Sequence, residues 1–400
     1  MATDIEDTVH AVDAAALLRL LPARPRVLAL GEPTHGEDTL LETRNALFRQ
    51  LVEDEGYRTI AIESDALLAL VVDDHVTSGA GTLDDVMEHG FSHGFGSSAA
   101  NRDLVRWMRA HNDGRPVEDQ VRFAGLDAPL EITGPASPRH ALLALHGCLA
   151  AEVDAESLPC TAATLDRLLG PDDRWTDEGA MRDPSRSVGR SPEAGELRLL
   201  ADDMTSLVHE RSPRLIARTS REAWDRARLY GRTASGLLRY HSWLADTSPG
   251  RMTRLLGVRD QLMADNLLAL AERGPTLAFA HHLHLQRHPG EMRMGGQPFR
   301  WWSAGALAAA RLGREYAVVT TGLGTIRHRG VDTPPKDTVE GLLYGLPQDR
   351  VLLDTRRPAT ALTDPPPTPR VSSWFGYFPL TPEHLTGSDA ILYIRDVPRV

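Results

Sequence analysis

The 400-residue sequence is poor in the features that would assign it to several classes of protein. Cysteine occurs only twice, at Cys148 and Cys160, which is too few for a zinc ribbon or a disulfide framework. No apolar run approaches the roughly 20 residues of a membrane-spanning helix. The amino-terminal segment, residues 1–13, is acidic and lacks the basic and apolar regions of a signal peptide. We therefore expect a cytoplasmic protein that does not associate with membranes.

Basic side chains are outnumbered by acidic ones, 44 to 55, which gives a formal net charge of −11. Lys336 is the only lysine, so arginine supplies the other basic side chains. A chain with this excess of negative charge is a poor general binder of nucleic acids or anionic lipids. We expect no nucleic-acid partner.

Several common catalytic and cofactor-binding motifs are also missing. There is no Gly-x-Ser-x-Gly sequence, which disfavours a serine α/β-hydrolase. There is no P-loop and no Gly-x-Gly-x-x-Gly opening a helix, so we expect no nucleotide cofactor. A His-Glu-x-x-His helix is absent as well. The sequence favours chemistry without a covalent nucleophile and without a cofactor, in which a histidine activates water.

Short apolar runs alternate with helical patterns in the first third of the chain. Strands are predicted over 27–30, 59–62 and 121–126, and helices over 39–53 and around 104–111. This alternation is typical of a parallel sheet whose strands are connected by helices.

A helical stretch then interrupts the alternation, from about residue 137 to residue 265. Amphipathic helices are predicted over 197–209 and 221–244, separated from the earlier part by a polar, turn-rich loop over 170–191. Strand patterns return at 276–280, 316–320, 351–353 and 390–394. We predict an α/β fold with a mainly parallel central sheet. Its core consists of residues 1–136 and 266–400, and residues 137–265 form a helical insertion.

Acidic and histidine residues follow the predicted strands at the point where each strand ends. Glu32 and His35 follow the first strand within Gly31-Glu32-Pro33-Thr34-His35, and Glu63 follows the second. His281 and His284 follow the strand at 276–280. Ligands of open α/β sheets bind outside the carboxyl ends of the strands. We therefore expect these five side chains to meet in one cleft.

His35 is the candidate catalytic base, because Glu32 lies three residues earlier and could fix the tautomer of the imidazole. The alternative is a loop histidine that only caps a helix or binds a carbonyl. His281 and His284 could donate hydrogen bonds to a developing oxyanion or serve as metal ligands. His282 is expected to point away from its neighbours, and His288 to lie on the surface.

Arg44 lies on the apolar face of the predicted helix at 39–53, three or four residues from its leucines and Phe48. Glu32 and Glu63, at the same edge of adjacent strands, would repel each other unless a cation lies beside them or one pKa is raised. We predict that Arg44 pairs with them in a buried network. A purely structural ion pair is an equally good interpretation of this pattern.

Aromatic residues occur in two segments flanked by glycine and proline. Trp301 and Trp302 form one pair, and Trp374 and Tyr377 belong to the cluster at 374–378. We predict that these four side chains contact a substrate, although packing in the core or in loops is the more common role of aromatic residues.

As a set, the motifs resemble the erythromycin esterase family, which includes succinoglycan-biosynthesis-type proteins. They follow the family's order between about residues 26 and 330: Gly31-Glu32-x-x-His35, Glu42-x-Arg44, Ile62-Glu63, Trp107-x-Arg109-x-x-Asn112, Gly125-x-Asp127, Arg259-Asp260-x-x-Met263-Ala264-x-Asn266, His281-x-x-His284 and Met294-Gly295-Gly296. The resemblance implies an α/β sheet with a helical domain and a small additional α+β part. It also implies ester hydrolysis with His35 as general base, surrounded by Glu32, Arg44, Glu63, His281 and His284. The chain departs from the family pattern at His282, where asparagine is usual, and at Pro33, where a small residue is more common.

Three classes of function remain open from the sequence. The leading one is a metal-independent esterase or lactonase that acts on a small natural product. The second is a hydrolase that uses the same glutamates and histidines as metal ligands. The third is a non-catalytic protein that binds a ligand or iron. Because Arg44 is expected to compete with a divalent ion for the carboxylates, we predict that no metal is bound.

Overall fold

The computed structural model describes residues 4–131, 134–357 and 362–398. The strands of its large sheet are β1 (Val9–His10), β2 (Val27–Glu32), β3 (Thr59–Asp65), β4 (Arg122–Asp127), β7 (Thr276–His281), β10 (Tyr316–Thr325), β11 (Arg350–Asp354) and β12 (Ala390–Asp396). Their order in space is β1-β11-β12-β10-β2-β7-β3-β4. From β12 to β4 all neighbouring strands are parallel, whereas β1 and β11 pair antiparallel at one edge. The predicted α/β fold with a mainly parallel sheet is confirmed.

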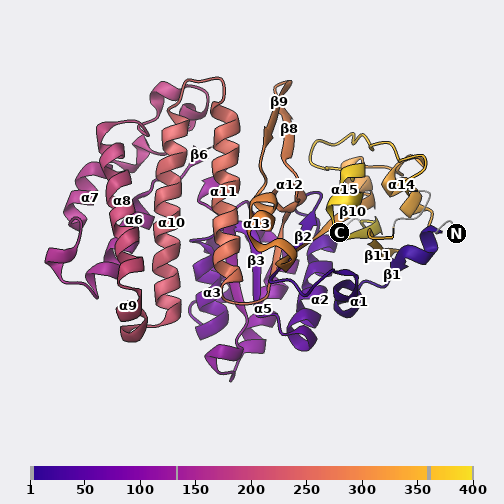
Figure 1. The fold of residues 1–400 in the computed structure, drawn as a ribbon, viewed down its shortest axis with the longest axis horizontal. Coiled ribbons are helices and arrows are strands. Elements are labelled where there is room, and N and C mark those ends of the chain that lie inside the picture. The colour runs from indigo at the N-terminus through magenta and orange to yellow at the C-terminus, as the bar shows by residue number, and fades with distance from the viewer. Residues whose placement is uncertain (1–3, 132–133, 358–361, 399–400) are drawn as a thin grey trace.

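The two faces of the sheet are covered by different helices (Figure 1). Successive residues of a strand point to opposite faces, and Leu28 and Leu30 of β2 therefore pack on one side while Val27 and Ala29 pack on the other. The first face is covered by α1 (Ala14–Leu20), α2 (Asp38–Glu55), α3 (Ala69–Ser78), α4 (Leu83–His89) and α5 (Ala99–Asn112). The second is covered by α11 (Arg251–Ala271) and α13 (Ala304–Leu312). Burial on both faces explains why these strands are continuous apolar runs.

Five further helices, called the helical layer below, form a separate apolar cluster beside the sheet. It contains α6 (Arg139–Ala150), α7 (Ala162–Leu169), α8 (Pro192–Glu210), α9 (Ser212–Arg218) and α10 (Arg221–Leu244). The loop predicted over 170–191 contains only turns and short 3-10 segments. α11 lies inside the predicted insertion but packs on the sheet through Met263 and Leu267. The proposed domain boundaries stay a prediction.

The remaining elements lie at different places around the sheet. β5 (Leu130–Glu131) and β6 (Gly134–Pro135) lie against α10, α12 (His282–Leu285) lies beside β2, and α14 (Val339–Tyr344) and α15 (Pro382–Gly387) lie beside β10 and β12. β8 (Gly290–Met294) and β9 (Gln297–Trp301) form a hairpin. The β8–β9 hairpin projects beside α11 in Figure 1. Among the residues that the structure describes, no helix combines the length and the apolarity needed to cross a membrane.

Candidate active site

Three neighbouring parallel strands end in the side chains of the candidate site. β7 lies between β2 and β3, so the strands that carry Glu32 and Glu63 are not neighbours. The prediction that these two strands are adjacent is wrong. The last residue of β7, His281, is the register partner of Glu32. β7 occupies this position because the chain returns to the centre of the sheet after the helical layer. The carboxylates are therefore separated by a strand that supplies an imidazole.

His35 follows β2 and forms a close pair with Glu32. Its Nδ1 lies 2.7 Å from Oε1 of Glu32, and its Nε2 lies 3.8 Å from Oε1 of Glu63. Burial alone would lower the pKa of His35, but the charges of Glu63 and Glu32 outweigh it and raise the pKa to about 9. Burial raises the pKa of Glu32 despite the opposing effects of His35. The two groups titrate as a coupled pair, in which the carboxylate orients the imidazole and stabilises its protonated form.

Glu63 is the most heavily engaged carboxylate of the site and is only 3% exposed. One oxygen accepts a hydrogen bond of 2.7 Å from the backbone N–H of His281, and the other lies 3.4 Å from Nε2 of His284. Burial would raise the pKa of Glu63, but His284, His35 and the Arg259 guanidinium together hold it well below its ordinary value. Glu63 therefore stays ionised in the neutral pH range.

Arg259 of α11 is the cation that neutralises this part of the site. Its guanidinium donates to Oε1 of Glu63 at 3.0 Å and to both oxygens of Asp127, at the end of β4, at 3.0–3.2 Å from Nε. These two carboxylates raise the pKa of Arg259 above its ordinary value although burial acts in the opposite direction. The planar guanidinium joins two strand ends that would otherwise repel each other.

Arg44 does not form the ion pair that its inward position predicted. It is buried, as expected, but its guanidinium donates to the side-chain oxygens of Asn45 and Asn101 and lies over the ring of Phe279. Within the described residues, no carboxylate lies within ion-pair distance of Arg44. Glu32 and Arg44 still influence each other's pKa through their charges. The prediction of a direct network is wrong because Arg259, from a helix far along the chain, occupies the position beside Glu63.

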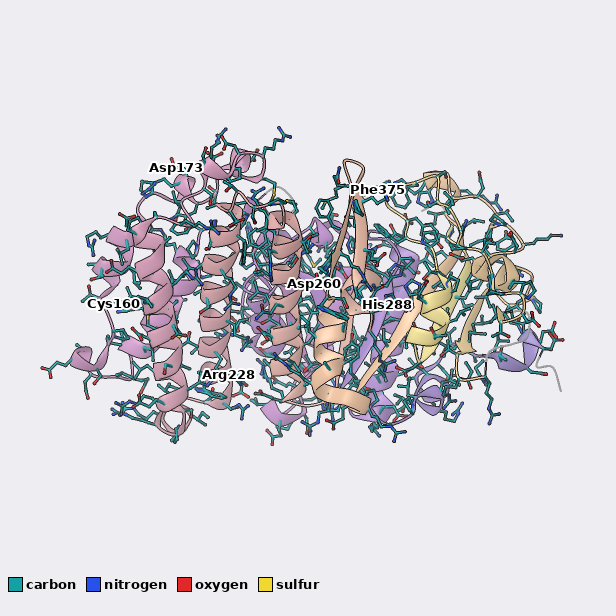
Figure 2. The ribbon with its side chains drawn as sticks, turned by 45° about the horizontal axis from the view of Figure 1, so that its top comes forward. Cys160, Asp173, Arg228, Asp260, His288 and Phe375 are labelled. Atoms are coloured by element: carbon teal, nitrogen blue, oxygen red, sulfur yellow. The ribbon has the colours of Figure 1, made fainter. Side chains whose placement is uncertain are left out.

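His284 is oriented by a second acidic residue. Its Nδ1 lies 2.9 Å from Oδ1 of Asp260, one residue after Arg259. Asp260 also accepts a hydrogen bond of 2.6 Å from the indole N–H of Trp301 and one of 2.8 Å from the backbone of Ala304. Burial would lower the pKa of His284, but Asp260 and Glu63 raise it. Figure 2 shows Asp260 at the foot of the β8–β9 hairpin, so the hairpin and the site share one carboxylate.

His281 is a neutral imidazole, since burial and the charge of His35 lower its pKa well below the ordinary value. Its Nδ1 accepts a hydrogen bond from the backbone N–H of Leu283, which assigns the proton to Nε2. The ring lies 5.4 Å from that of His35 and 4.6 Å from that of Phe378. His281 therefore supplies an N–H donor close to the imidazole of His35.

A glycine allows this arrangement of histidines. A Cβ on Gly31 would lie 2.8 Å from Cβ and 2.9 Å from Cα of His282. The short helix α12, which carries His282 and His284, can therefore approach β2 only because residue 31 has no side chain.

His282 and His288 lie outside the site. The ring of His282 packs 4.9 Å from that of His384 on α15, and the ring of His288 packs 5.4 Å from His384. The prediction that His288 lies on the surface is wrong, because it is half-buried beneath α15 and its Nε2 is inaccessible to solvent. We assign no catalytic role to His282, His288 or His384.

The predicted aromatic contacts occupy two kinds of position. Trp301 and Tyr377 are buried, and their polar atoms bond to Asp260 and to Leu323 and Glu340 respectively. Trp302 is 61% exposed, and Trp374 is half-buried under Arg329. Contact with a substrate stays a prediction for all four. Other aromatic rings touch the site: Phe95 lies 5.4 Å from His35, Phe378 lies against His281, and Phe279 lies under Arg44.

The site offers nitrogen and oxygen atoms of the kind that bind metals, and several of them bond to other side chains of the site. In the described part of the chain, Oε2 of Glu32 and Nε2 of His281 have no hydrogen-bond partner. Among the described residues, no group of three or more His, Cys, Asp or Glu side chains is arranged to hold a metal ion. Metal independence stays a prediction. A small cavity reaches the site and is lined by Glu32, Gly36, Leu41, Arg44, Ile62, Glu63, Phe95, Asn101 and Phe279.

Sequence reasoning assigned no role to Asp127, Arg259 and Asp260. A usable signal existed for Asp127, which ends a predicted strand as Glu32 and Glu63 do. Arg259 and Asp260 lie on a helix whose buried positions include Leu255, Val258 and Leu262. Charged residues on such a face need a partner. The partner could not be identified, because nothing in the sequence shows that α11 packs against the ends of β3 and β4.

A mostly parallel sheet with helices on both faces, and coupled glutamate, histidine and arginine side chains at its carboxyl edge, define an α/β protein with a site suited to proton transfer. The chain belongs to the erythromycin esterase family, whose sequence model matches residues 52–397. That match begins after Glu32, His35 and Arg44. The correspondence of these three residues therefore rests on their motifs.

Solved structures have the same fold. A Bacillus cereus protein is 18% identical with a TM-score of 0.71, over 99% of this chain and 92% of that one. A succinoglycan biosynthesis protein is 16% identical with a TM-score of 0.71, over 98% and 95% of the two chains. A variant of the erythromycin esterase EreC in its open conformation is 17% identical with a TM-score of 0.63, over 95% and 92%. No curated protein matches the sequence.

Proposed function

We propose that the protein hydrolyses an ester or lactone of a small-molecule natural product, using water activated by His35 and no covalent intermediate. Membership of the erythromycin esterase family supports hydrolysis of an ester or lactone, and a structural neighbour carries the name of an erythromycin esterase. The observation that carries the proposal is the orientation of His35. Its Nδ1 is held by Glu32 at 2.7 Å, and its side chain is 37% exposed, so that a water molecule can reach Nε2.

In this proposal, Nε2 of neutral His35 accepts a proton as the water oxygen attacks the ester carbonyl. Glu32 and Glu63 stabilise the imidazolium that results. The N–H of His281 donates to the oxyanion of the tetrahedral intermediate. Collapse of the intermediate breaks the bond to the alcohol oxygen, which takes the proton from His35. The products are a carboxylic acid and an alcohol, or a hydroxy acid from a lactone.

The test is a screen of ester and lactone natural products, followed by mass spectrometry in ¹⁸O-labelled water. One ¹⁸O atom is expected in the carboxylic acid under single-turnover conditions. His35→Ala is expected to lower turnover at least about a hundredfold while the protein remains folded, as expected for loss of a general base.

His328→Ala is the matched control, because His328 also pairs with a glutamate, Glu37, at 3.2 Å but contacts no residue of the site. Its turnover is expected to match that of the wild type. Wild-type turnover in His35→Ala, or an acyl-enzyme detected in a burst phase, would contradict the proposal.

A further inference from the structure

The hairpin of β8 and β9 is a separate two-stranded sheet that projects beside α11 (Figure 1). A hairpin of two strands is at best marginally stable by itself, so its position depends on the contacts at its base. Trp301, the last residue of β9, lies at this base and is buried, whereas the next residue, Trp302, is exposed. The hydrolysis proposed above uses neither side chain.

The indole of Trp301 is bonded to a carboxylate that also serves the candidate active site. Its N–H donates to Oδ2 of Asp260 at 2.6 Å. The other oxygen of Asp260 accepts from Nδ1 of His284 at 2.9 Å and from the backbone N–H of Ala304 at 2.8 Å. A carboxylate bonded through one oxygen alone can turn about that oxygen. Because Trp301 holds the second oxygen, the plane of the Asp260 carboxylate is fixed.

The orientation of Asp260 reaches the proposed base through His284. Nε2 of His284 lies 3.4 Å from Oε1 of Glu63. The same oxygen of Glu63 lies 3.8 Å from Nε2 of His35. A series of polar contacts therefore leads from the hairpin, through Asp260 and His284, to the carboxylate beside the base. If Asp260 turns, the ring of His284 loses the partner that fixes its Nδ1 and can rotate away from Glu63.

Both strands of the hairpin set the position of the indole. Gly290 of β8 is the register partner of Trp301. A Cβ on Gly290 would lie 2.8 Å from Cζ2 and 2.9 Å from Cε2 of the indole, so the ring packs directly on the backbone of β8. Cε2 is bonded to the nitrogen that donates to Asp260. The N–H therefore moves with the base of the hairpin.

We propose that Trp301 is a positioning residue of the site: its indole N–H fixes the carboxylate of Asp260, which holds the ring of His284 beside Glu63. The β8–β9 hairpin is then part of the support of the site, and a displacement of its base releases His284. This positioning is a property of the folded protein. Only its effect on turnover rests on the proposed hydrolysis.

NMR of the full-length protein with ¹⁵N-labelled histidine tests the proposal without a substrate. A proton on Nδ1 of His284 that is bonded to buried Asp260 is protected from exchange with water, and its signal is identified by its loss in His284→Gln. Trp301→Phe removes the donor and keeps an aromatic ring. Exchange of the His284 proton is expected to become about tenfold faster, the order of effect of losing one hydrogen bond. Trp302→Phe, the matched change at the neighbouring exposed position, is expected to leave it unchanged.

Gly290→Ala is the second variant, because it keeps the indole but pushes its ring away from β8. It is expected to accelerate exchange of the same proton. Unchanged exchange in either variant, or faster exchange in Trp302→Phe, would overturn the proposal.

A cleavable ester provides the kinetic measurement. In Trp301→Phe, kcat is expected to fall about tenfold with little change in KM, because His284 is misplaced and the binding surface is kept. A raised KM with kcat unchanged would assign Trp301 to substrate binding and overturn the positioning role. If no ester is cleaved by the wild type, the proposed function fails, and the exchange rates still decide the role of Trp301.

Discussion

At the scale of single residues, the unusual feature is a histidine whose protonated form is stabilised by two carboxylates. The pKa of His35 is raised to about 9, mainly by Glu63 and Glu32 acting against burial. A general base must be neutral to accept a proton, so the base is fully available only above this pH. We expect turnover to rise roughly tenfold per pH unit below about pH 9 and then to level off. A pH–rate profile on a neutral ester measures this pKa. If turnover levels off near pH 6.5, the ordinary pKa of histidine, the two carboxylates do not raise the pKa of His35.

The raised pKa of His35 also makes the stability of the protein depend on pH. Because the folded-state pKa of His35 lies above its unfolded value of about 6.5, the stabilising contribution of the charged imidazole is fully present below that value. It is lost as the pH rises from about 6.5 to about 9. The pH dependence of unfolding in this window should be weaker in His35→Ala than in the wild type.

The two buried arginines should differ in what their removal costs. Arg259→Met would leave Glu63 and Asp127 buried without their cation, and we expect a loss of about 3–5 kcal/mol in the free energy of unfolding. Arg44→Met introduces the same side chain, but it leaves only the neutral acceptors Asn45 and Asn101 without their donor. We therefore expect a loss of about 1–3 kcal/mol in the free energy of unfolding. Urea denaturation of the two variants measures both values. A larger loss for Arg44→Met would mean that Arg44, not Arg259, neutralises the carboxylates.

At the scale of secondary-structure elements, the approach of α12 to β2 decides where the histidines lie. In Gly31→Ala, the added Cβ would contact the backbone of His282 at 2.9 Å, so α12 must move away from the strand. We expect turnover to fall on the order of a hundredfold, as for a displacement of about 1 Å in a catalytic group. Gly257→Ala is the control, because its Cβ would meet nothing within 4 Å on helix α11. Equal activities of the two variants would show that the position of α12 is unimportant.

The positions of strands and helices along the chain were predicted better than the contacts between them. The apolar runs at 27–30 and 276–280 were recognisable because both faces of these strands are buried. The amphipathic pattern also placed Arg44 on an inward face. Neither pattern contains the order of strands, so β7 was not expected between β2 and β3. For the same reason Arg259 was missed as the partner of Glu63, since their contact spans 196 positions of the chain.

At the scale of the whole molecule, the open chemical question is the role of metal. Arg259 and Asp260 engage Glu63 and His284, the groups that a divalent ion would otherwise use. We therefore expect purified protein to contain no stoichiometric metal and to keep its activity after exhaustive chelation. Elemental analysis before and after chelation, with turnover measured on both samples, decides the question. Activity that disappears on chelation and returns with one particular ion would establish a metal-dependent hydrolase.

The central position of β7 has a consequence for the order of assembly. During synthesis, β2 and β3 leave the ribosome long before β7. The helical layer is made after β3 and before β7. Until β7 arrives, the nascent sheet has a gap at its centre and exposes strand edges that can pair wrongly. Contacts of such long sequence separation form slowly. The candidate site, whose halves lie on either side of that gap, can therefore form only after β7 has joined β2 and β3.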